Sequence, residues 1–143
     1  MNLSAPNSPK NNTSEPHLSR VRRICMAMPD ATEKLSHGQP TFFARKKVIA
    51  MFADHHHKDS RVAVWIPAAP GQQAALAGMA PETYFRPPYV GAYGWVGIDL
   101  EQIDDEDLAG HIRDAWTVIQ GKARQGKARQ GKLPAQRKPK VLT

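Results

Sequence analysis

Three short apolar segments lie close together near the middle of the chain, and they constrain the fold more than any other feature. Parallel neighbours in a sheet need a crossover of about a dozen residues or more, whereas antiparallel neighbours need only a turn. The turns here are short and polar, RKK and DHHHKDS. They therefore predict an antiparallel meander. The three expected strands span 41–44, 48–53 and 61–67.

Segments with helical patterns precede and follow this meander. Ser14 is a good helix cap, and apolar residues recur at helical spacing after it, so a helix is expected over 14–28. Its three arginines, at 20, 22 and 23, would take the outer face. Segment 29–40 is expected to be a loop.

Further along the chain, the sequence predicts a short helix, a loop with an extended piece over 81–91, a strand and a last helix. The short helix opens at Pro70, and the strand covers 94–100. The last helix is expected to be capped by Asp104 or Asp105 and to end at Gly121. This order predicts an α+β fold, an antiparallel sheet with flanking helices.

Basic charge is concentrated at the C-terminus. Eight of the 20 Lys and Arg residues lie in 121–143, which has no acidic residue, so 1–120 holds 12 basic and 13 acidic residues. The repeat GKARQ-GKARQ-GK makes this end low in complexity. We expect a disordered segment over 1–13, a folded domain over 14–121 and a disordered basic tail over 122–143.

The single cysteine and the lack of long apolar runs indicate where the protein is located in the cell. It has one cysteine, Cys25, among apolar neighbours, which predicts a buried packing thiol in a reducing compartment. It has no apolar run of about 18 residues and no apolar signal core at its start. We expect a cytoplasmic monomer or weak dimer that contacts no membrane.

Five stretches of the chain form a recognisable combination: ICMAMPDATEKLSHGQPTF (24–42), KVIAMFAD (47–54), RVAVWIP (61–67), YFRPPYVGAYGWVGIDL (84–100) and the closing helix through Asp107, Ile112 and Ala115. This combination resembles the MmcQ/YjbR family of small bacterial proteins. The resemblance implies a CyaY-like (frataxin-like) α+β fold, which is also compared with a double-wing DNA-binding architecture. It implies DNA binding as the activity. One departure is that Ala92-Tyr93-Gly94, before Trp95, carries no charge.

A non-enzymatic DNA-binding protein is therefore the leading hypothesis. A basic turn at the tip of a hairpin can lie along a groove and contact phosphates, and a basic tail can add sequence-independent affinity. We expect no cofactor. The candidate nucleic-acid contacts are Arg45, Lys46, Lys47, Arg61 and Arg86 in the body, and Lys122, Arg124, Lys127, Arg129 and Lys132 in the tail.

Other functions remain open on the sequence alone. The main alternative is a small-molecule pocket, possibly enzymatic, formed by Glu33, His37, Trp65 and Trp95. Another is an adaptor role for the last helix, since 99–114 holds seven acidic residues and one arginine. The run at 55–57, HHH, lacks evident further ligands, so no metal site is expected.

Overall fold

The computed structural model describes residues 9–55 and 61–131, with side chains described for 14–55 and 61–121. The strands in these residues form one antiparallel sheet in the order β1-β2-β3-β4-β6-β5. Their bounds are Ala31–Ser36 (β1), Gln39–Ala44 (β2), Lys47–Asp54 (β3), Val62–Ile66 (β4), Tyr84–Phe85 (β5) and Val96–Asp99 (β6). The predicted meander is β2-β3-β4, and the α+β class is confirmed.

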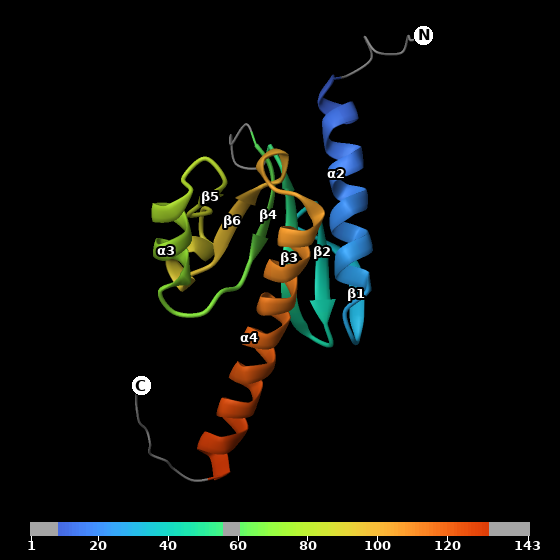
Figure 1. Cartoon of the computed structure of the whole chain (residues 1–143). Coiled ribbons are helices and arrows are strands. Elements are labelled where there is room, and N and C mark those ends of the chain that lie inside the picture. The colour runs from blue at the N-terminus through green and yellow to red at the C-terminus, as the bar shows by residue number, and fades with distance from the viewer. Residues whose placement is uncertain (1–8, 56–60, 132–143) are drawn as a thin grey trace.

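Two long helices lie against the same face of this sheet, as Figure 1 shows. A shorter helix, α3, packs beside the edge strand β5. None of the described helices is both long and apolar enough to cross a membrane. The helices are α2 (Pro9–Met26), α3 (Gln72–Met79) and α4 (Asp105–Gly131), with single 3₁₀ turns η2 (Val90–Tyr93) and η3 (Leu100–Gln102).

The main core lies between the sheet and helices α2 and α4. Successive residues of a strand point to opposite faces, and β4 accordingly sends Val62, Val64 and Ile66 into this core. The helices contribute residues that recur every three or four positions. Those of α2 are Val21 and Cys25, and those of α4 are Leu108, Ile112, Ala115 and Ile119.

A smaller apolar cluster lies on the other face of the sheet. Trp65 is its largest buried member, with 3% of its surface exposed, and it packs with Ala53 and Ala63. Partly buried side chains complete the cluster: Met51, Phe85, Val90 and Trp95. Trp65 of β4 and Trp95, which directly precedes β6, therefore lie in this cluster, away from the long helices.

The segment 29–40 is not a loop as expected, because strand β1 and a tight turn occupy most of it. β1 pairs along its whole length with β2, and the turn between them is His37-Gly38. Both turn residues have positive φ, 53° and 79°, as a two-residue hairpin turn of type I′ requires. β1 is polar because it is an edge strand, and this composition hid it from the sequence analysis.

Both long helices extend further than predicted. α2 begins at Pro9 rather than Ser14, and proline suits the first turn of a helix. α4 continues through Gly121 to Gly131. Lys, Ala, Arg and Gln are strong helix formers, and a helix already started has no nucleation cost, so the repeat continues it despite its glycines. The predictions for 1–8 and 132–143 lie outside the described residues, and the domain boundaries stay predictions.

Candidate nucleic-acid interface

The turn between β2 and β3 carries three exposed basic residues, Arg45, Lys46 and Lys47. Arg45 has a positive φ of 60°, and its backbone amide donates to the carbonyl of Asp30. Its guanidinium forms an ion pair with the Asp30 carboxylate at 3.1 Å. Both side chains are mostly exposed, so this pair contributes little to stability. It orients Arg45 while the two lysines project into solvent.

The same end of the molecule also carries the basic extension of α4. Figure 1 shows α4 running past the β2–β3 turn and continuing beyond the sheet. The indole Nε1 of Trp116 donates to the carbonyl of Pro29 at 3.1 Å, which fixes α4 beside the Asp30–Arg45 pair. After Gly121 the sequence of the helix is the basic repeat. Two candidate phosphate-binding elements, distant in sequence, therefore lie at one end of the fold.

Arg61 and Arg86 lie apart from that end. Arg61 immediately precedes β4, whose first residue pairs with Asp54, so it lies at the opposite end of β3 from Lys47. Its guanidinium stacks on the Phe85 ring, 3.9 Å from the centroid. Arg86 follows β5, three strands from β3, and packs on Gly91, where a Cβ atom would lie 2.6 Å from its Cγ. Neither arginine continues the patch of the β2–β3 turn.

The four residues of the alternative pocket lie in three different places. Trp65 and Trp95 share the small cluster described above. Glu33 projects from β1 toward α2, where both its carboxylate oxygens accept from Arg22 at 2.8 Å. This bond lowers the pKa of Glu33. His37 is exposed at the β1–β2 turn. The structure thus brings the two tryptophans together, and it places the acid and the histidine elsewhere.

The lone cysteine and the histidine run at 55–57 were also considered as reactive or metal-binding groups. Cys25 is fully buried, as predicted, and burial raises the pKa of its thiol to about 12, so it stays protonated at neutral pH. Nδ1 of His55 pairs with the Asp54 carboxylate. His56 and His57 lie outside the described residues, and the absence of a metal there stays a prediction.

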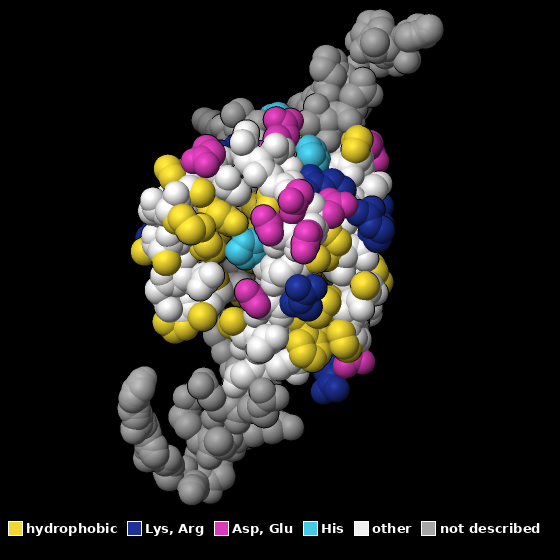
Figure 2. All heavy atoms as spheres, in the orientation of Figure 1, with side chains coloured by type: hydrophobic (Ala, Val, Ile, Leu, Met, Phe, Trp, Pro, Cys, Tyr) yellow, Lys and Arg dark blue, Asp and Glu magenta, His cyan; other side chains and the backbone are white. Residues whose placement is uncertain are grey.

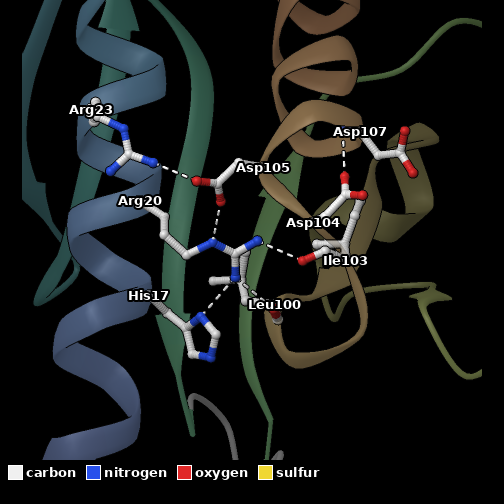
Figure 3. Close-up of polar contacts among 8 residues, drawn as sticks. All are labelled: His17, Arg20, Arg23, Leu100, Ile103, Asp104, Asp105 and Asp107. Carbon is white, nitrogen blue, oxygen red and sulfur yellow. Dashed lines mark hydrogen bonds and ion pairs between the residues drawn. The ribbon is translucent and has the colours of Figure 1, made fainter.

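Arg20 forms a polar link between α2 and α4 that the sequence analysis missed (Figure 3). It was expected on the outer face, but only 17% of its side chain is exposed. It pairs with Asp105 at 2.6 Å and donates to the carbonyls of Leu100 and Ile103. It also donates to Nδ1 of His17 at 2.8 Å. These bonds fix the start of α4 against α2.

Asp104 caps α4, as predicted, and its neighbour Asp105 is held by two arginines. The Asp104 carboxylate accepts from the backbone amide of Asp107 at 2.8 Å. The hydrogen bond from Arg20 is the main cause that lowers the pKa of Asp105, and Arg23 adds to it. The acids of this first helical turn suit the positive end of the helix dipole. Their arrangement is that of a stabilised helix start.

The sequence analysis also missed His111, a half-buried histidine of α4. Its Nε2 lies 2.7 Å from the hydroxyl of Tyr84, and the two rings meet edge to face. Burial lowers the pKa of His111, although Asp114 and Asp107 act in the opposite direction. Burial also raises the pKa of Tyr84. His111 lies next to Ile112, a core residue of α4, but no local signal in the sequence identified Tyr84 as its partner.

Comparison with known proteins identifies the family. No curated protein and no solved structure gave a match, so the CyaY-like comparison stays a prediction. The model of the YjbR family, however, matches residues 26–118, more than half of the chain. This match runs from the end of α2 to the last buried turns of α4, through every strand of the sheet. The chain therefore belongs to the YjbR family.

Proposed function

We propose that this protein is a non-enzymatic DNA-binding protein that contacts the phosphates of duplex DNA without reading base sequence. The observation that carries the proposal is the shared position of the β2–β3 turn and the basic extension of α4 at one end of the fold (Figure 1). Both elements are rich in Lys and Arg, the side chains that contact phosphate oxygens. Phosphate contacts position a protein on DNA but carry no sequence information.

The charge distribution of the molecule supports DNA binding at the end that carries the β2–β3 turn. The opposite end of α4 is acidic, with Asp105, Glu106 and Asp107 in its first turn. Figure 2 shows acidic side chains gathered over that part of the molecule. A polyanion would be repelled from this end and attracted to the other. The bipolar charge along α4 therefore favours DNA approaching the end that carries Lys46 and Lys47.

The proposal is tested by measuring the affinity of the full chain for duplex DNA across a salt series. Each phosphate contact contributes about −0.9 to the slope of log affinity against log salt. Changing Lys122, Arg124, Lys127 and Arg129 together to Gln should reduce the slope by about 2 to 4. Lys46→Ala with Lys47→Ala should reduce it by no more than about 2. Both losses should be nearly independent of DNA sequence.

Lys34→Ala is the matched control. Lys34 lies over the Phe43 ring, 5.1 Å from its centroid, in the middle of β1 and away from the turn. Its loss removes the same charge as Lys46→Ala and should leave the slope unchanged. Equal effects of Lys34→Ala and Lys46→Ala would show that net charge, not the proposed surface, governs binding. Absence of salt-dependent binding to duplex DNA would reject the function.

A further inference from the structure

A cleft between α3 and α4 lies away from the proposed DNA-binding end. It consists of two cavities of about 280 Å³ and 470 Å³. Both are lined by Leu76 of α3 and by His111 and Asp114 of α4. The DNA-binding proposal uses none of these residues.

The smaller cavity has an apolar lining with a few polar groups at its edge. Ligand sites in proteins are typically concave and mostly apolar, with few polar groups that orient the ligand. The apolar side chains come from the ends of two strands and from both helices: Ile66, Val96, Leu76 and Val118. At about 280 Å³ the cavity fits a ligand the size of one substituted ring.

The charged groups around the cleft are mainly acidic. The second cavity adds the carboxylates of Glu106 and Asp107 and the guanidinium of Arg113 to the shared Asp114. The cleft is therefore lined by three carboxylates and one guanidinium. His111 adds no positive charge at neutral pH, because burial lowers its pKa below the ordinary value of 6.5. The cleft thus combines an apolar lining with a net negative edge.

We propose that the α3–α4 cleft binds a small organic cation, a primary amine attached to an aromatic or similarly compact apolar body. The apolar body contacts Leu76 and Val118, and the ammonium group lies at the Asp114 carboxylate. Apolar burial supplies most of the affinity, and Asp114 selects the cation. The hydrogen bond with Tyr84 orients the His111 ring, which lines both cavities.

The proposal is tested with 2-phenylethylamine, added to the full chain at pH 7.5 and followed by the backbone amide signals in NMR. We expect binding in the millimolar range, which is well within the ceiling of affinity per atom for a ligand of about nine non-hydrogen atoms. Amide shifts are expected around Leu76, His111 and Val118. Two probes of similar shape, 2-phenylethanol and 3-phenylpropionate, replace the cation by a neutral group and an anion. The expected order of affinity is amine, alcohol, acid.

Variants separate charge selection from cavity filling. Attraction between two opposite unit charges about 4 Å apart in water raises affinity about fivefold. Asp114→Asn should therefore reduce the affinity for the amine by up to about fivefold and leave the affinity for the alcohol unchanged. Glu101→Gln removes an exposed acid that does not line the cleft and should change neither. Ala69→Trp should fill the smaller cavity and abolish binding of all probes, because Ala69 is an exposed lining residue.

Ala74→Trp, at an exposed position of α3 that does not line the cleft, should retain binding. The proposal is wrong if the amine and the acid bind equally well. It is also wrong if the shifts map to the Trp65–Trp95 cluster, or if Ala69→Trp binds as the unchanged protein does. None of these outcomes depends on DNA binding, so the two proposals fail separately.

Discussion

Gly97 in β6 lies directly beneath the ring of Phe85, its pairing partner in β5. A Cβ atom at this position would lie 2.4 Å from the ring, far inside van der Waals contact. The same ring carries the stacked guanidinium of Arg61. The absence of a side chain at Gly97 thus permits the packing at this edge of the small cluster.

We expect Gly97→Ala to destabilise the fold by about 1 to 3 kcal/mol, as overpacking of a fitted site does. The free energy of unfolding in urea measures this. Gly78→Ala is the matched control, because a Cβ there meets no atom within 4 Å. Gly78 lies inside α3, so its replacement should stabilise the protein by about 0.5 to 1 kcal/mol. Equal responses of the two variants would contradict the packing argument.

Helices α2 and α4 are joined by a polar network that is sensitive to protonation. Nδ1 of His17 accepts a hydrogen bond from Arg20, which in turn holds the start of α4 (Figure 3). Burial and the nearby Arg20 charge lower the pKa of His17. On the other side of α4, burial lowers the pKa of His111 beside Tyr84. Both histidines favour the neutral form in the folded state.

Acidification should therefore destabilise these contacts. Below the unfolded pKa of about 6.5 the unfolded chain binds more protons than the folded one, so stability falls as the pH drops through the lowered pKa values. The contribution of the two neutral histidines to stability is complete above about pH 6.5 and is lost below it. Changing His17 and His111 together to Gln should flatten the dependence of the unfolding free energy on pH between 7 and 5. His37→Asn, at an exposed turn position, should leave the slope unchanged. An unaltered slope in the double variant would exclude both histidines as its source.

At the scale of the whole molecule, α4 separates an acidic end from a basic one. From Glu106 to Lys122 the helix rises about 24 Å, at about 1.5 Å per residue. The Debye length is about 10 Å in 0.1 M salt and about 30 Å in 0.01 M salt. The acidic end should therefore influence DNA binding at the basic end only when salt is low.

Glu106→Gln with Asp107→Asn should change DNA affinity less than about twofold in 0.1 M salt and should raise it severalfold in 0.01 M salt. Asp30→Asn is the contrasting variant, because Asp30 pairs with Arg45 within the proposed interface. It should raise affinity at both salt concentrations. Titrations of labelled duplex DNA measure both effects. An equal gain from the two variants in 0.1 M salt would place the DNA nearer the acidic end.

Elements with a strong local signal could be predicted, and those defined by their partners could not. The strands of the meander and the apolar stripe of α4 follow from apolar periodicity, a property of a few neighbouring residues. Strand β1 was missed because its polar composition reflects its edge position, and only pairing with β2 makes it a strand. The end of α4 was predicted at Gly121, because glycine disfavours an isolated helix. In the structure the repeat extends a helix that already exists, and α4 ends at Gly131.

For the candidate sites, the sequence by itself determined which chemistry is available. It showed the basic turn at 45–47, the basic repeat and the family pattern. Tertiary structure decided which of these groups meet. The β2–β3 turn and the α4 extension lie at one end of the fold, and Arg61 lies at the opposite end of β3. The packing of α2 against α4 buries most of Arg20, and the packing of α3 beside α4 forms the cleft at His111. The reason is physical: residue types and local periodicity are encoded in neighbouring positions, whereas a surface or cavity is made by residues tens of positions apart.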